Sequence, residues 1–112
     1  MNDKVFSYLG LAQRSGNLVS GEDTCERLMK KNGAKLLIIS KDASNNTQKK
    51  FVDMATYRNI KYFIFGHREE LSAAIGKSNR AVYCIKDEGF AEKIYRLLEE
   101  AEGCSNKSGG EE

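Results

Sequence analysis

Three charged side chains in the first third of the chain, Asp23, Arg27 and Lys31, are spaced for binding an anion along one helix face. Positions i, i+4 and i+8 of an α-helix share a face, and the apolar Leu28 and Met29 mark the opposite, buried side. The stripe begins close to a predicted helix start, where free amides and the helix dipole favour phosphate. A surface pairing of Asp23 with Arg27 explains the same spacing without a ligand, so the stripe alone leaves both interpretations open.

A second polar segment joins a predicted helix to a predicted strand and consists of Lys77, Ser78, Asn79 and Arg80. Two cations and two hydrogen-bonding side chains suit contact with phosphates and with polar base edges. An ordinary surface loop has the same composition, however. Six aromatic side chains lie in apolar runs typical of a core and predict no clear stacking platform for single strands: Phe6, Tyr8, Tyr62, Phe63, Phe65 and Phe90.

Sequence signatures of enzymes and metal centres are missing. There is no P-loop and no GxGxxG, GxSxG or HExxH motif. His67, the single histidine, stands at a predicted helix start, where a solvated or capping role is more typical than that of a general base. Cys25, Cys84 and Cys104 form no CxxC pair, and Cys25 and Cys84 are expected to be small core residues. We therefore expect no catalysis, no cofactor and no metal site.

Charge is distributed unevenly along the chain. Residues 1–86 carry 15 Lys or Arg against 8 Asp or Glu, a net +7, whereas residues 87–112 carry 3 against 8, a net −5. A basic body with an acidic C-terminal end favours an anionic partner, nucleic acid first. A solvated surface with an acidic solubilising tail is an equal alternative on charge alone.

Length and hydropathy predict one domain. At 112 residues and 40% hydrophobic composition, the chain can form one modest core but not two ordinary domains. We assign residues 1–102 to this domain and predict that residues 103–112 are a flexible polar tail. The apolar runs are too short to cross a membrane, and the first residues lack a signal-peptide pattern. A cytoplasmic protein without membrane contact is expected.

One apolar run stands out as a buried strand. Residues 36–39, Leu-Leu-Ile-Ile, do not alternate with polar residues, which predicts a central strand covered by helices on both faces. Asp42, Ser44 and Asn45 follow it and can cap the next helix with their side-chain oxygens.

Helical and strand patterns alternate along the chain. Earlier in the sequence, Ser20 with Asp23 three residues later resembles a capping box for the second helix. The predicted helices span about residues 2–14, 20–33, 44–58, 67–75 and 88–102, the last after an Asp87 cap, and the predicted strands lie at about residues 18–19, 35–40, 61–65 and 80–85. This alternation predicts an α/β fold in the form of a three-layer α/β/α sandwich.

Four segments together resemble a known family: VSGEDTCERL, AKLLIISKDASNNT, EELSAAIGKSNRAV and GFAEKI. They are similar to the small bacterial YlxQ-type members of the superfamily of kink-turn RNA-binding ribosomal proteins, over about residues 3–100. The resemblance implies a mixed four-stranded sheet in the α/β/α sandwich and no catalysis. It also implies binding to structured RNA, ribosomal RNA in particular, in or near the ribosome, with other ribosome-associated proteins as further partners.

The resemblance places the RNA site at a helix N-terminus and a nearby loop. The family's first segment reads Gly-x-Asn-Glu-x-x-Lys, for which this chain supplies Gly21, Asp23, Thr24 and Arg27. Thr24 lacks the carboxylate that accepts from guanine edges in non-canonical pairs, and the second loop is polar where the family usually has apolar residues. We therefore expect RNA binding to be retained better than strict kink-turn specificity.

The expected roles of the site residues divide by chemistry. Five cations are expected to neutralise phosphates: Arg27, Lys31, Arg68, Lys77 and Arg80. Three polar side chains are expected to contact base edges or 2′-hydroxyl groups: Asp23, Thr24 and Asn79. The backbone at Gly21 would allow close approach. The chief alternative is a protein-interaction adaptor on the same fold, which an exposed apolar patch would favour; an enzyme at a subunit interface is weaker, since no residue pair supports it.

Overall fold

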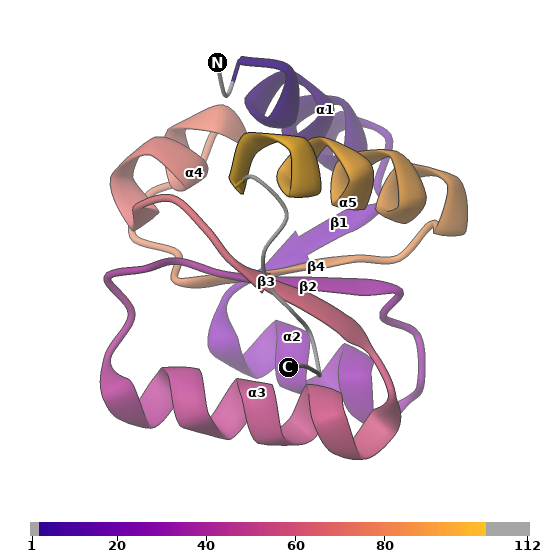
Figure 1. Cartoon of the computed structure of the whole chain (residues 1–112), viewed down its shortest axis with the longest axis vertical. Helices are drawn as coiled ribbons and strands as arrows, with labels where there is room; N and C mark the ends of the chain where they lie inside the picture. Colours follow the sequence, from indigo (N-terminus) through magenta and orange to yellow (C-terminus); the bar gives the residue numbers. More distant parts are fainter. Residues whose placement is uncertain (1–2, 103–112) are drawn as a thin grey trace.

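A computed structural model describes residues 3–102 of the chain, which form five helices and four strands (Figure 1). The helices are α1 (Asp3–Arg14), α2 (Glu22–Lys30), α3 (Asn45–Arg58), α4 (Arg68–Ala74) and α5 (Glu88–Glu102). The strands are β1 (Leu18–Ser20), β2 (Leu36–Ile39), β3 (Lys61–Ile64) and β4 (Val82–Ile85). Every predicted helix and strand is present, and only the ends differ. The predicted tail, residues 103–112, lies outside the described part of the chain.

The four strands form one mixed sheet in the order β1-β4-β2-β3. Strand β4 is antiparallel to both β1 and β2, and β2 is parallel to β3, which confirms the expected mixed four-stranded sheet. Strands β1, β2 and β3 therefore all point the same way and finish at one end of the sheet, where β4 begins. We call this end the carboxyl end of the sheet.

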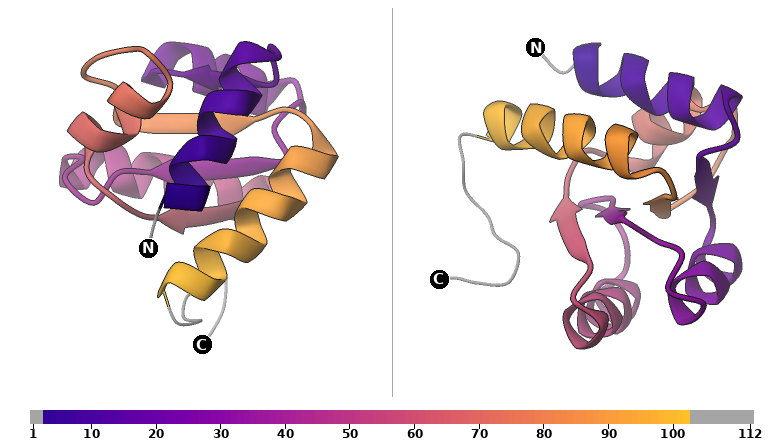
Figure 2. Two further views of the ribbon diagram at one scale, coloured as in Figure 1. Left: turned by 90° about the horizontal axis from the view of Figure 1, so that it is seen from above. Right: turned by 90° about the vertical axis from the view of Figure 1, so that its right-hand side faces the viewer.

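Helices cover both faces of the sheet and complete the predicted three layers. Helices α1, α4 and α5 lie on one face, and α2 and α3 lie on the other (Figures 1 and 2). Each helical layer packs its own hydrophobic cluster onto the sheet. The sheet is thus the shared middle layer of two cores.

Strand β2 shows why its sequence is continuously apolar. Leu36 and Ile38 belong to the cluster with α1, α4 and α5, whereas Leu37 and Ile39 belong to the cluster with α2 and α3. All four side chains are fully buried, so neither face of the strand has room for a polar residue. The prediction of a central strand covered on both sides is confirmed. Cys25 and Cys84 are also buried in the second cluster, as expected.

Two of the predicted helix caps are confirmed. The Ser44 side chain accepts a hydrogen bond from the Thr47 amide at 3.1 Å at the start of α3. At the start of α5, the Asp87 carboxylate accepts from the Phe90 amide at 2.9 Å. Both are the short-range bonds that satisfy free amides in the first turn.

The capping role predicted for Ser20 is wrong. Gly21 occupies the N-cap position of α2 with φ +97° and makes no side-chain cap bond. Glycine adopts this left-handed conformation at little cost, so the chain turns from β1 into α2 there. Ser20 is the last residue of β1, and its hydroxyl accepts from the Arg80 Nε at 3.2 Å instead.

Within residues 3–102, no helix is both long enough and apolar enough to cross a membrane.

Candidate functional site

Three helices start at the carboxyl end of the sheet. Helices α2, α3 and α4 follow β1, β2 and β3 directly, and the loop before β4 returns to the same end, at the left of Figure 1. The Glu22 carboxylate accepts from the Thr47 hydroxyl at 3.2 Å, so the first turns of α2 and α3 are held side by side. Free amides and the positive ends of two helix dipoles therefore face one surface, which favours an anion.

The two polar segments singled out in the sequence meet at this surface. Gly21 and Arg80 are so close that a Cβ atom at Gly21 would lie 3.9 Å from the Arg80 Cδ. Gly21 also donates its amide to the Val82 carbonyl at 3.0 Å, which fixes the start of α2 against β4. The helix start and the loop are thus parts of one site.

Arg68 is held by its neighbours at the first residue of α4. Its Nη1 donates to the Asn79 Oδ1 at 3.1 Å, and its Nη2 donates to the Asp42 carbonyl at 3.0 Å. The Arg68 amide donates to the Asp42 Oδ1 at 3.0 Å. Partial burial raises the pKa of Asp42, but nearby hydrogen-bond donors, first the Arg68 amide, and the Arg68 charge together outweigh it and hold that pKa below the ordinary value.

The predicted capping role of Asp42 therefore needs correction. It caps α4, not the α3 helix that follows it in the chain, because the parallel pairing of β2 and β3 brings the ends of these two strands together. Ser44 alone performs the predicted side-chain capping of α3.

Two buried polar side chains beneath the loop escaped the sequence analysis. Ser72 on α4 accepts from the Arg80 amide at 2.8 Å, and the Tyr83 hydroxyl on β4 donates to the Arg80 carbonyl. The hydroxyls of Ser72 and Tyr83 lie 3.1 Å apart. Burial raises the pKa of Tyr83, so its hydroxyl stays protonated and can donate. The available signal was a serine on the buried side of α4, next to Leu71.

The exposed face of α2 carries Asp23, Thr24 and Arg27 as predicted. Within residues 3–102, no side-chain hydrogen bond or ion pair engages these three residues, so the alternative Asp23–Arg27 surface pair is not formed. The ion pairs on this helix belong to Glu26, which contacts both Lys30 and Lys50 at 3.1 Å and 2.8 Å. Arg27 is therefore free to meet a ligand.

Lys31 lies one turn beyond Arg27, at the end of α2 that is far from Gly21. It is the C-cap of α2, ten positions after Gly21, and thus roughly 15 Å away along the helix axis. The helical spacing of Asp23, Arg27 and Lys31 was correct, but the stripe runs away from the carboxyl end of the sheet. Lys77 is exposed in the loop before β4, and its amide donates to the Ser72 carbonyl at 2.8 Å.

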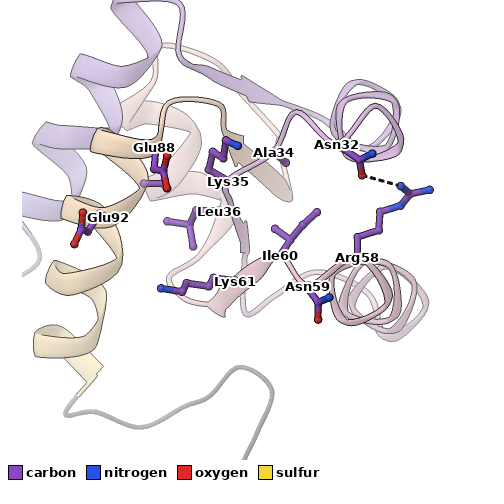
Figure 3. A pocket seen from close by; sticks show the side chains of 11 residues that line it. Asn32, Ala34, Lys35, Leu36, Arg58, Asn59, Ile60, Lys61, Glu88 and Glu92 are labelled. Carbon is purple, nitrogen blue, oxygen red and sulfur yellow. Dashed lines mark hydrogen bonds between the residues drawn. The ribbon is translucent and has the colours of Figure 1, made fainter.

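A separate cavity of about 500 Å³ opens at the opposite end of the sheet (Figure 3). Arg58 donates to the Asn32 side chain there at 3.2 Å and joins the ends of α2 and α3, while Lys35, Lys61 and Glu88 also line the cavity. Its mixed charges and its distance from Gly21 and Arg80 place it outside the candidate site. Among residues 3–102, no group of three His, Cys, Asp or Glu side chains could hold a metal ion.

Sequence comparisons agree with this architecture. Residues 3–95 match the ribosomal protein L7Ae/L30e/S12e/Gadd45 family. The RNA-binding protein YlxQ of Bacillus subtilis (strain 168) is 40% identical over 94 residues, which are 84% of this chain and 94% of that protein. The RNA-binding protein YlxQ of Enterococcus faecium is 36% identical over 96 residues, or 86% and 92% of the two chains.

Solved structures show the same fold. A protein of unknown function from Bacillus halodurans superposes with a TM-score of 0.83 at 36% identity, covering 86% of this chain and 97% of that one. A 15.5kD RNA-binding protein of Giardia lamblia has a TM-score of 0.73 over 91% and 88% of the two chains, and at 14% identity it supports the fold alone. By sequence and by fold, this chain is therefore a YlxQ-type member of the ribosomal protein L7Ae/L30e/S12e/Gadd45 family.

Proposed function

We propose that this protein binds structured RNA through the carboxyl end of its sheet and catalyses no reaction. The observation that carries the proposal is the proximity of the start of α2 to Arg80 of the loop before β4, which is hydrogen-bonded to Ser20 beside Gly21. It joins a phosphate-favouring helix start to a polar, basic loop on one exposed surface. The names of the two curated relatives, both RNA-binding proteins, support the same function.

Different site residues contact different parts of the RNA. Arg27, Lys77 and Arg80 neutralise phosphates, because their side chains reach solvent at or near the helix start. Asp23 and Thr24 meet base edges or 2′-hydroxyl groups, and Gly21 lets the backbone of the RNA come close because it has no side chain. Lys31, at the far end of α2, contacts only an RNA that extends along the helix.

The RNA is a folded element rather than a single strand. Single-strand binders stack bases on exposed aromatic rings. Phe63 and Phe65 are buried in the core, and the exposed Tyr57 lies in the last turn of α3, away from Gly21 and Arg80. A kink-turn or a related ribosomal RNA element fits a site made of a helix start and one loop. We extend the proposal to a cytoplasmic, ribosome-associated protein, for which the family membership is the support.

Within residues 3–102, no exposed apolar patch supports the alternative of a protein-interaction adaptor. The exposed large hydrophobic side chains in residues 3–102 are Leu11, 43% exposed, and Tyr57, 83% exposed. They lie on α1 and α3, in different helical layers, and so do not form one apolar patch.

Fluorescence anisotropy with three labelled RNAs of equal length tests the proposal. The RNAs are a kink-turn, the same RNA with its non-canonical pairs replaced by Watson–Crick pairs, and an unstructured strand. We expect both folded RNAs to bind more tightly than the unstructured strand at low salt, with the kink-turn at least as tight as its paired control. Failure of every folded RNA to bind at low salt would contradict RNA binding and favour the protein-interaction adaptor instead. If a folded RNA binds, crosslinking in cells followed by RNA sequencing would identify the natural target.

A further inference from the structure

The loop before β4, residues 76–81, is fastened at both ends by one buried residue. The Ser72 carbonyl accepts a hydrogen bond from the Lys77 amide at 2.8 Å, and the Ser72 hydroxyl accepts one from the Arg80 amide at 2.8 Å. Tyr83 holds the Arg80 carbonyl from the other side. Since Ser72 and Tyr83 are buried, these bonds are partly shielded from water and fix the backbone at the two ends of the loop.

The exposed tip of the same loop is fastened by Arg68. Asn79 has φ +55°, a left-handed conformation that asparagine tolerates better than most residues. Its side-chain oxygen accepts a hydrogen bond from the Arg68 Nη1 at 3.1 Å, and the Arg68 Nη2 donates to the Asp42 carbonyl at 3.0 Å. Arg68 therefore bridges the loop after β2 and the loop before β4.

The Arg68 bridge determines whether Asn79 presents hydrogen-bond donors or an acceptor to a ligand. A guanidinium has only hydrogen-bond donors, so the amide group that faces it must present its oxygen. The exposed Asn79 then directs its two N–H groups elsewhere. Arg68, in turn, has an Asp42 oxygen 3.7 Å from its Nε, and its side chain is only 35% exposed. Its charge is partly balanced, and two of its N–H donors are held by Asn79 and Asp42.

We propose that Arg68 is a positioning residue and not a phosphate contact, and that it fixes Asn79 as a hydrogen-bond donor toward acceptor atoms of the RNA. The inference rests on the proposed function and changes the role first expected for Arg68. Lysine cannot replace this arginine, because an ammonium is a point charge and lacks the planar fork that spans two partners.

Two variants and two matched controls test the inference. Arg68→Lys keeps the charge but loses the fork, and Arg96→Lys makes the same exchange in an exposed Glu92 ion pair on α5. Asn79→Asp keeps an oxygen for Arg68 but removes the donor, and Ser78→Asp adds the same charge one residue away. Each variant is checked by circular dichroism, and order at the 79 and 80 amides is measured in the free protein by the heteronuclear ¹⁵N NOE.

We expect Arg68→Lys to lower the NOE of both amides and to weaken binding of the labelled kink-turn RNA about three- to tenfold, which is the usual cost of ordering mobile side chains on binding. Arg96→Lys should change neither. Asn79→Asp should keep the loop ordered yet bind more weakly than Ser78→Asp, because only the former loses a donor.

Each half of the inference can fail separately. An Arg68→Lys protein with wild-type loop order would overturn the positioning role, whatever its RNA affinity. Equal affinities for Asn79→Asp and Ser78→Asp would overturn the donor role. If the wild type binds no folded RNA, the donor role falls with the proposed function, while the NOE of the free protein still decides whether Arg68 holds the loop.

Discussion

Arg27→Ala is the sharpest test of the proposed binding surface. The Arg27 side chain is exposed on α2, and within residues 3–102 it has no hydrogen-bond or ion-pair partner. Its removal should therefore change the free energy of unfolding by no more than about 0.5 kcal/mol. Any loss of RNA affinity then reports a lost contact and not a damaged fold.

The expected magnitude follows from the number of cations that the proposed function assigns to phosphates. Arg27, Lys77 and Arg80 would neutralise three phosphates, which gives a log-log salt slope of about −2.1 to −2.7. A fourfold rise in salt should then weaken binding by roughly 20- to 40-fold. With two cations left, Arg27→Ala should show a slope of about −1.4 to −1.8 and a loss of only roughly 7- to 12-fold.

The assay is fluorescence anisotropy with the kink-turn RNA at several salt concentrations. Lys93→Ala is the control, because Lys93 is an exposed cation on α5, which covers the other face of the sheet from α2. Its slope should equal that of the wild type. If Lys93→Ala reduces affinity and slope as much as Arg27→Ala does, attraction is diffuse and the proposed surface is wrong.

Three further predictions concern stability. Leu37→Ala removes a fully buried side chain from the α2 and α3 side of the sheet and should cost about 2–5 kcal/mol in urea unfolding, against less than about 1 kcal/mol for the exposed Leu11→Ala; equal costs would contradict the assignment of the core. The pKa of Asp42 is lowered in the fold, so its carboxylate stabilises the protein above about pH 4 and this contribution is lost as the pH falls further. The difference in melting temperature between the wild type and Asp42→Ala should therefore shrink from pH 6 to pH 3, and a constant difference would show that the Asp42 charge is not stabilising. Deleting residues 103–112, which include no apolar side chain except Cys104, should leave the melting temperature nearly unchanged, whereas a loss of several degrees would show that this segment docks on the domain.

Features of the fold that depend only on residues close together in the sequence could be predicted. The unbroken apolar run of residues 36–39 predicted a strand buried on both faces, because burial on alternate sides leaves no polar position. The caps at Ser44 and Asp87 could be predicted because a capping side chain reaches an amide only three residues away. The helical spacing of α2 likewise placed Arg27 on an exposed face.

Other features depend on segments far apart in the chain. Asp42 and Arg68 are 26 residues apart, and Ser20 and Arg80 are 60 residues apart, yet each pair is joined by a hydrogen bond. These contacts follow from the order and direction of the strands, which bring three strand ends and the loop before β4 together. Periodicity and capping patterns contain no information on strand order, so sequence reasoning assigned Asp42 to the wrong helix. The sequence by itself determined the elements and the chemistry available for binding, and the tertiary structure decided which of those side chains meet.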